Sequence, residues 1–297
     1  MKKKYFLILL IGLLSMTIGC QRGEEPAVEK EAAPSTIIDK AISADGVAIA
    51  YEARGEGEPV LFFVHGWSNN RSLWDYQLDH FSQSYRVAAI DLAGFGDSEN
   101  TRDEWTMEAY GGDVDAVLKE LDLRNVILIG FSMGASAVIE AAKLSPERVK
   151  GIVLVDFPKN IERVYSEKFI SGSEKNLMNQ VTDTNVEKVL PSFINNAEEL
   201  AVRYVAMVKD APKKGWRESI RSIWLWCHET CVESLRQSEV PVTSINGDYS
   251  PTNVEAFQKY VPSYKAKIIT GSGHIVSWEF PDEFNRRLEE AIQEFLE

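Results

Sequence analysis

Two kinds of segment alternate along the chain from about residue 37 onward. Strands buried on both faces of a sheet are expected from short, nearly continuous apolar runs such as "PVLFFVHG", "YRVAAIDLAG", "NVILIG" and "VKGIVLVDF". Between these runs, apolar residues recur every three or four positions, as in "SLWDYQLDHF" and "ASAVIEAAKLSP", which predicts amphipathic helices. This alternation predicts an α/β fold, with a mostly parallel, doubly wound sheet and helices on both of its faces.

The alternation is interrupted once. Residues 159–237 contain no buried-strand run, but they carry helical patterns, including "WRESIRSIWLWCHETCVESL". The strand and helix pattern resumes with "PVTSI" and ends with the helix "PDEFNRRLEEAIQEFL". The sequence therefore predicts one core, made of residues 37–158 and 238–297, with residues 159–237 inserted into it as a helical unit.

The first 19 residues differ in kind from the rest of the chain. The basic start "MKKK" precedes the apolar run "YFLILLIGLL", which is too short to span a bilayer comfortably and is typical of a signal peptide. The following "TIGC" resembles the lipobox of bacterial lipoproteins, in which cleavage leaves a lipidated cysteine, here Cys20. Thr17 stands where leucine is usual, so an ordinary secretory cleavage near Gly19 is the alternative.

Residues 20–36 are polar and charged and contain no aromatic residue, which predicts a flexible tether. Together, the two N-terminal segments predict an exported protein whose lipid anchor holds it on a bacterial membrane, facing the periplasm or the cell exterior. The membrane contact is expected through this anchor only.

The formal charge of the chain is -13, from 32 basic and 45 acidic residues. Such an acidic balance argues against nucleic acid or an anionic bilayer surface as a general partner, but it does not identify a substrate. The sequence contains no phosphate-binding glycine loop, and we expect no cofactor and no metal. In "CHETC", Cys227 and Cys231 are expected as buried free thiols, with a disulfide or a metal site as alternatives.

The motif G-x-S-x-G spans Gly130 to Gly134, directly after an apolar strand and directly before a helix. In this setting the serine sits on a strained turn, so its neighbours must be small, and its hydroxyl stands at a helix N-terminus. Free N–H groups and the helix dipole favour negative charge there. The motif predicts Ser132 as a nucleophile, and a glycine-rich turn with a capping serine is the alternative.

With this motif, the chain from Ile37 to Glu297 resembles the α/β-hydrolase family. The stretch "FFVHGW" resembles the family's oxyanion loop, which implies that the backbone N–H groups of Trp67 and Met133 form an oxyanion hole. The stretch "DLAGFGDSE" is similar to the family's D-x-x-G-x-G-x-S turn, and "TGSGHIVSWEFPDEFN" resembles the segment that carries the catalytic histidine. A serine at position 132 implies acyl chemistry, because epoxide hydrolases and haloalkane dehalogenases of this fold have aspartate there.

Four histidines compete for the role of the base. His80 lies in a predicted helix far upstream, His65 belongs to the oxyanion loop, and His228 lies in the insertion. His274 follows a strand and a turn of small residues, in the order serine, acid, histidine that the fold uses. A nucleophilic serine needs such a base within hydrogen-bond reach, so His274 is the candidate.

The family's usual acid position falls in "PVTSINGDYSPTN", three residues after the glycine, where this chain has Ser250. Serine cannot stabilise an imidazolium as a carboxylate does. The stretch is otherwise explained as a helix start, with Ser250 as the N-cap before a proline, or with Thr252 and Glu255 as a capping box.

Two carboxylates are candidates for the missing acid. Asp156 ends "GIVLVD", a strand expected beside the nucleophile strand, and "SPERVKGIVLVDFP" resembles the acid-bearing stretch of some haloalkane dehalogenases. Asp248 lies in the turn "NGD", where an aspartate usually bonds its own backbone. We favour Asp156, with Asp248 as the alternative and a water-assisted Ser132–His274 dyad as the third possibility.

In the family, an insertion at residues 159–237 forms a helical cap over the active site. The resemblance implies an apolar pocket suited to an apolar acyl or alcohol group, and its candidate lining residues are Phe131, Phe193, Trp216, Ile220, Ile223 and Trp224. Alternatively, the side chains from the cap only bury it against the core.

The leading hypothesis is a serine hydrolase that cleaves carboxylic esters of small, apolar substrates through a Ser–His–acid triad and an acyl-enzyme. The same triad would also serve a C–C hydrolase, a thioesterase or a perhydrolase. A different class of function, ligand binding by a hydrolase fold that has lost catalysis, is disfavoured by the intact Ser132 and His274.

Overall fold

The computed structural model describes residues 36–182, Val202, Met207 and residues 215–297. The predicted signal peptide, Cys20 and nearly all of the predicted tether lie outside these residues. None of the helices within the described ranges is both long enough and apolar enough to span a bilayer.

Eight strands form one sheet, in the order β1-β2-β4-β3-β5-β6-β7-β8. Only the pairings β1–β2 and β2–β4 are antiparallel, and the other five are parallel. The predicted mostly parallel α/β sheet is therefore confirmed. The strands are β1 (Ile37–Ile42), β2 (Ala48–Arg54), β3 (Val60–Val64), β4 (Val87–Ile90), β5 (Val126–Phe131), β6 (Val149–Val155), β7 (Val242–Gly247) and β8 (Lys265–Ile269).

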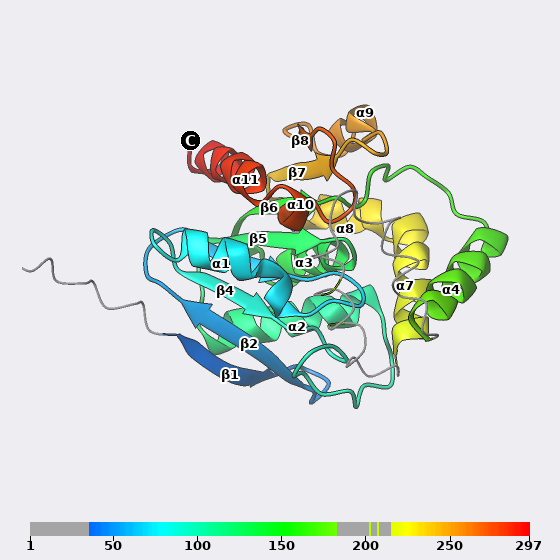
Figure 1. Cartoon of the computed structure of the whole chain (residues 1–297), viewed down its shortest axis with the longest axis horizontal. Helices are drawn as coiled ribbons and strands as arrows, with labels where there is room; N and C mark the ends of the chain where they lie inside the picture. Colours follow the sequence, from blue (N-terminus) through cyan, green and yellow to red (C-terminus); the bar gives the residue numbers. More distant parts are fainter. Residues whose placement is uncertain (1–35, 183–201, 203–206, 208–214) are drawn as a thin grey trace, which may run out of the picture. The chain divides into compact units, whose positions relative to one another are not determined.

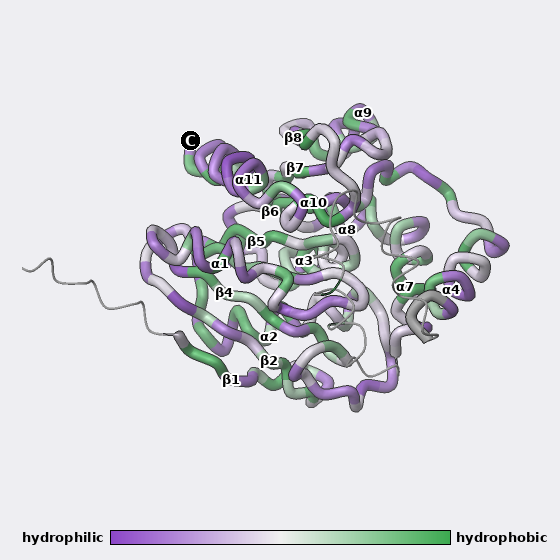
Figure 2. The backbone as a smooth tube through the Cα atoms, in the orientation of Figure 1, coloured by the Kyte–Doolittle hydropathy of each residue, from purple (hydrophilic) through white to green (hydrophobic). Residues whose placement is uncertain are grey.

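Helices cover both faces of the sheet (Figure 1). In this view α1 (Asp75–Phe81) and α11 (Pro281–Leu296) lie in front of the strands, and α2 (Met107–Glu120) and α3 (Met133–Leu144) lie behind them. The strands β3, β4 and β5 are buried along their whole length because both faces are covered. Helix α11 alternates green and purple in Figure 2, as expected for a helix with one face on the core and one in water.

Shorter elements complete the described core. The 3₁₀ helix η1 (Arg71–Trp74) leads into α1, and η2 (Pro146–Arg148) leads into β6. Helix α9 (Val254–Gln258) follows β7, and α10 (Val276–Glu279) precedes α11.

In the insertion, α4 (Glu167–Thr182) packs against α7 (Trp216–Glu229). The segment "WRESIRSIWLWCHETCVESL" forms two helices, because Thr230 separates α7 from α8 (Cys231–Ser238). All but the last residue of α8 fall inside the range predicted for the helical unit, yet α8 packs against α3 of the core.

Cys227 and Cys231 are buried free thiols, and no disulfide joins them. Burial raises the pKa of both thiols, which keeps them protonated and weakly nucleophilic. They act as small apolar side chains in the packing of α7 and α8.

Candidate active site

Ser132 lies on a sharp turn between β5 and α3, with a φ of 51° and a ψ of −118°. A positive φ is costly for a residue with a side chain and persists only where the surroundings enforce it. The two glycines of the motif are required by packing. A Cβ at Gly130 would lie 2.4 Å from the carbonyl oxygen of Gly134, and one at Gly134 would lie 2.4 Å from that of His65.

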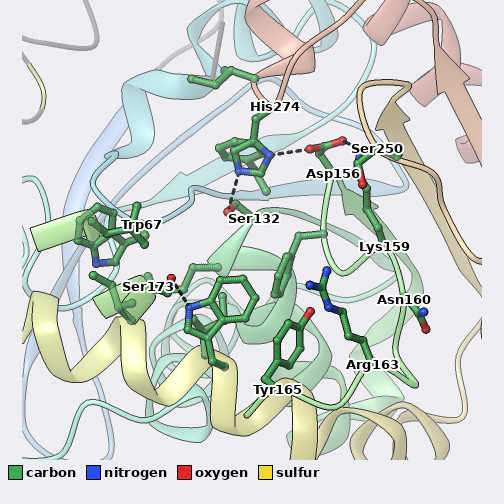
Figure 3. A pocket seen from close by; sticks show the side chains of 18 of the residues that line it. Trp67, Ser132, Asp156, Lys159, Asn160, Arg163, Tyr165, Ser173, Ser250 and His274 are labelled. Atoms are coloured by element: carbon green, nitrogen blue, oxygen red, sulfur yellow. Dashed lines mark hydrogen bonds and ion pairs between the residues drawn. The ribbon is translucent and has the colours of Figure 1, made fainter. Parts of the chain in front are cut away.

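His274 lies in the loop between β8 and α10, where its ring contacts two other predicted site residues (Figure 3). Its Nε2 lies 3.1 Å from the Ser132 Oγ, and its Nδ1 lies 2.5 Å from Oδ2 of Asp156. Because a carboxylate only accepts, Nδ1 carries the proton and Nε2 is left to accept from the serine. The structure thus brings Ser132, His274 and Asp156 into one hydrogen-bonded chain.

Asp156 follows β6 directly, with a side chain that is 0% exposed. Its Oδ1 accepts from the Gly247 N–H at 2.9 Å and pairs with Nζ of Lys159 at 3.0 Å. Its Oδ2 accepts from the Tyr249 hydroxyl at 2.6 Å and from His274. These four donors offset the cost of removing the carboxylate from water and fix its orientation.

Asp248, the alternative acid, lies elsewhere. Its side chain is exposed, and Oδ1 accepts the backbone N–H of Gly271 at 2.9 Å, in the loop that leads to His274. The expectation that it bonds its own backbone is therefore corrected: the bond joins two loops. Asp248 makes no hydrogen bond to His274 among those the described residues form.

The helix start predicted near Ser250 is also corrected. Helix α9 begins at Val254, and its N-cap is Asn253, whose side chain accepts from the Ala256 N–H at 3.1 Å. Ser250 lines the cavity described below, and its carbonyl oxygen accepts from Lys159 at 3.1 Å.

Trp67 and Met133, the predicted oxyanion-hole residues, line the same cavity as Ser132. Met133 is the first residue of α3, so its N–H has no acceptor within the helix. The loop that carries Trp67 lies against the serine turn, because a Cβ at Gly66 would come within 3.0 Å of the Ser132 Cβ.

His65 orders this loop through both ring nitrogens. One ring nitrogen, Nδ1, donates to the carbonyl oxygen of Gly66 at 2.7 Å, and Nε2 accepts from the Leu92 N–H at 3.0 Å. Burial lowers the pKa of His65 to about 4, so the ring is neutral at neutral pH and holds both bonds at once.

A cavity of about 690 Å³ lies beside Ser132 and His274. Its apolar wall includes Phe131 from the core and Ile220, Ile223 and Trp224 from α7, as predicted. The predicted Phe193 lies outside the described residues. The charged lining residues in the described part are Asp156, Lys159 and Arg163, together with the titratable His274.

Trp216, which was predicted to line the pocket, does not. It is 1% exposed and packs edge-on against Trp67 at 5.0 Å and parallel to Phe95 at 5.7 Å between ring centroids. Its carbonyl oxygen accepts from Nε1 of Trp67 at 3.1 Å. Trp216 therefore joins the start of α7 to the oxyanion loop, because its side chain is needed there for packing.

Sequence reasoning missed Lys159 and Tyr249, the two side chains other than His274 that hold Asp156. Lys159 stands three residues after Asp156, and Tyr249 stands beside the vacant acid position at Ser250. Both positions could have been found by asking which donors the sequence supplies near the chosen carboxylate.

The family model for the alpha/beta hydrolase fold matches residues 59–281, and the chain belongs to this family. Its structural neighbours include an esterase and an enol-lactonase, and the chain is an enzyme of the α/β-hydrolase type.

Two curated relatives align over nearly their whole length. A non-heme chloroperoxidase of Kitasatospora aureofaciens is 25% identical, over 84% of this chain and 97% of that protein. A 3-oxoadipate enol-lactonase of Acinetobacter baylyi is 22% identical, over 86% and 96%.

Solved structures share the fold at low identity. A bromoperoxidase from Bacillus anthracis superposes with a TM-score of 0.74 at 21% identity, covering 88% of this chain and 99% of that one. A thermophilic esterase from Thermogutta terrifontis gives 0.73 at 20% identity, with coverage of 88% and 99%.

Proposed function

We propose that this enzyme cleaves carboxylic esters of small, largely apolar molecules through an acyl-enzyme on Ser132. The observation that carries the proposal is the chain of hydrogen bonds from the Ser132 Oγ through His274 to Asp156, at the wall of a cavity of about 690 Å³. This is the arrangement that activates a serine: a base in reach of the hydroxyl, and a buried acid that orients the base.

In the proposed first step, the Ser132 Oγ bonds to the ester carbonyl carbon while Nε2 of His274 takes the hydroxyl proton. The carbonyl oxygen becomes an oxyanion and accepts from the N–H groups of Trp67 and Met133. When the ester C–O bond breaks, His274 returns the proton to the leaving alcohol. Water then repeats the sequence on the acyl-enzyme and releases the acid.

Asp156 favours the Nδ1–H tautomer of His274 and stabilises the positive charge that the ring gains in each transition state. The apolar side chains of α7 exclude water from the acyl group, and a drier site strengthens each of these electrostatic interactions.

The test is labelling of the purified protein with a fluorophosphonate, together with hydrolysis of p-nitrophenyl esters. We expect Ser132→Ala to lose labelling and to lower turnover by at least about 10³-fold, with His274→Ala nearly as severe. The double variant should be little worse than either single one, because the two residues act as a unit. Independent, multiplying losses would contradict the pairing.

A second candidate, perhydrolysis, is favoured by the relatives described as non-heme chloroperoxidases. In that reaction hydrogen peroxide, rather than water, attacks the acyl carbon and gives a proton to His274. The bond from this carbon to the Ser132 Oγ then breaks, His274 returns the proton to the serine, and a peracid is released. Peracid formation from acetate and peroxide, absent in Ser132→Ala, would support this candidate.

We also propose that the protein is exported and anchored by lipid at Cys20, since "TIGC" follows a basic start and a short apolar run. Cys20→Ala should move the protein from the membrane fraction to the soluble fraction of the cells. A variant that stays with the membranes would place the anchor elsewhere.

A further inference from the structure

Lys159 is held against the carboxylate that orients His274. Its Nζ lies 3.0 Å from Oδ1 of Asp156 and donates to the carbonyl oxygens of Gly247 at 2.8 Å and Ser250 at 3.1 Å. The Lys159 side chain is only 12% exposed. A positive charge fixed in this way is weakly screened by water and acts on the whole Asp156–His274 pair.

Tyr249 acts on the other oxygen of the same carboxylate. Its hydroxyl donates to Oδ2 of Asp156 at 2.6 Å and lies 3.2 Å from Nδ1 of His274. Burial of the phenol end and the Asp156 charge raise the pKa of Tyr249, so it remains a donor. The ammonium of Lys159 lies 3.7 Å from the centre of the tyrosine ring, which places both residues in one cluster.

We propose that Lys159 and Tyr249 are positioning residues that take up part of the Asp156 charge, so that His274 stays unprotonated at lower pH than it would beside an unopposed carboxylate. The proposal rests on the proposed function, in which the unprotonated ring is the base. A carboxylate raises the pKa of a neighbouring histidine, and a cation beside that carboxylate lowers it.

Three described side chains lie at the ring nitrogens of His274, and none of them is altered in a Lys159 variant. Ser132 lies at Nε2, and Asp156 and Tyr249 lie at Nδ1. Glu279 of α10 accepts from the backbone N–H of the residue before His274 at 3.0 Å and 3.1 Å. Glu279 is present in the wild type and in the variants alike, so the effect of its negative charge cancels in the comparison.

Without the Lys159 charge, the negative charge of Asp156 is less opposed and favours the protonated imidazole more strongly. The acid limb of the kcat/KM profile then moves to higher pH, by about half a unit to one unit for a charge at this range. Below the wild-type midpoint, this shift lowers kcat/KM by about 3- to 10-fold, whereas the loss at high pH is smaller.

Two measurements on the full chain test the proposal: the pH dependence of p-nitrophenyl acetate hydrolysis, and NMR titration of His274, assigned with a His274→Asn variant. We expect Lys159→Met to raise both midpoints, Tyr249→Phe to raise them less, and the charge-retaining Lys159→Arg to leave them near the wild-type value. The Tyr249→Phe variant keeps the proposal testable if Lys159→Met does not fold.

A Lys159→Met protein that melts earlier but keeps the wild-type midpoints would overturn the proposal, because Lys159 would then only fasten the loops after β7. The NMR titration needs no ester turnover. Absence of esterase activity in the wild type would therefore refute the proposed function without deciding the role of Lys159.

A separate observation concerns Arg163, a second cation on the cavity wall. In the described part of the chain, no ion pair or side-chain hydrogen bond joins its guanidinium to another residue. The group lies 5.1 Å from the ring centre of Tyr165 and 5.5 Å from that of Phe169. In Figure 3 the Arg163 side chain extends toward the cavity beside Tyr165.

Among the described lining residues, positive charges outnumber negative ones by one when His274 is neutral. Asp156 and Lys159 pair with each other, which leaves Arg163 as the surplus charge among the described lining residues, in a chain whose formal charge is -13. We infer that the preferred substrate carries a carboxylate remote from its ester group, which the Arg163 guanidinium binds while α7 contacts the apolar part. This inference also rests on the proposed function.

Monomethyl glutarate and methyl pentanoate form a matched pair that differs by a carboxylate in place of a methyl group. We expect Arg163→Gln to lower kcat/KM for the glutarate ester by about 10-fold or more, since hydrogen bonds to charged groups are the stronger ones, and to leave methyl pentanoate nearly unchanged. Arg217→Gln, on the exposed side of α7, is the control and should alter neither.

Equal effects of Arg163→Gln on the two esters, or none on either, would overturn the carboxylate assignment. Hydrolysis of methyl pentanoate reports on the proposed function alone, so the two ideas fail separately.

Discussion

The ends of β6 and β7 lie side by side in the sheet, and each strand is followed directly by an aspartate. Asp156, after β6, has a side chain that is 0% exposed and receives four donors. Asp248, after β7, is exposed and accepts one backbone N–H. The same local sequence pattern thus gives two different environments, depending on what packs around each strand end.

The difference decides which carboxylate can orient a histidine. An exposed carboxylate is screened by water and keeps its rotamer freedom, so its interaction with a ring is worth little. A buried one interacts strongly, but it is stable only when donors satisfy it from several sides. The strand that would usually supply the acid, β7, instead supplies donors to Asp156, namely the Gly247 N–H and, just beyond, the Tyr249 hydroxyl.

The largest expected effect comes from removing the charge after β6. Asp156→Asn keeps the shape of the side chain but presents an amide to Nδ1 of His274, which favours the wrong tautomer and leaves the imidazolium without a partner. The corresponding change in the serine protease triad lowers turnover by about 10⁴-fold, and we expect at least about 10² here. The measurement is kcat for p-nitrophenyl esters.

Thermal melting is the control, because Lys159 would lose its anionic partner in Asp156→Asn. We expect a folded protein with a lowered melting temperature. A folded Asp156→Asn enzyme with near-normal kcat would show that the buried carboxylate is not the acid.

Much of this comparison could be predicted from the sequence. Apolar runs marked the buried strands, and G-x-S-x-G with a histidine after the last strand marked Ser132 and His274 as a pair. Asp156 was favoured, but Asp248 remained an alternative because both directly follow a buried strand. Only the pairing of β6 with β7 places the Gly247 N–H on Asp156.

The contacts of the helices inserted between β6 and β7 could not be predicted for a similar reason. A tryptophan in an inserted helix can either line a pocket or pack against the core. From the sequence, Trp216 and Trp224 were both predicted to line the pocket. The tertiary contacts separate them: Trp216 packs on Trp67 and Phe95, whereas Trp224 lines the cavity.

A smaller effect, an increase in kcat, is expected from introducing a carboxylate after β7. In the Asp156→Asn background, Ser250→Asp places a carboxylate at the family's usual position, on a residue that already lines the cavity and bonds Lys159. We expect kcat to rise by about tenfold over Asp156→Asn alone, within the coupling found between residues of one network. The same change in the wild type should give no gain, since Asp156 already holds His274.

The smallest effect is expected at Asp248. In Asp248→Asn the amide oxygen can still accept the Gly271 N–H, so kcat should stay within about threefold of the wild type and the melting temperature should hold. Asp248→Ala removes that acceptor, so the loop before His274 loses one hydrogen bond. The free energy of unfolding should fall by about 1 kcal/mol. Comparing Asp248→Asn with Asp248→Ala distinguishes a residue that links two loops from a catalytic acid. Asparagine can replace the linking residue, but it cannot replace the acid. If Asp248→Asn greatly lowered kcat while Asp156→Asn left it near the wild-type value, the roles assigned to the two aspartates would have to be exchanged.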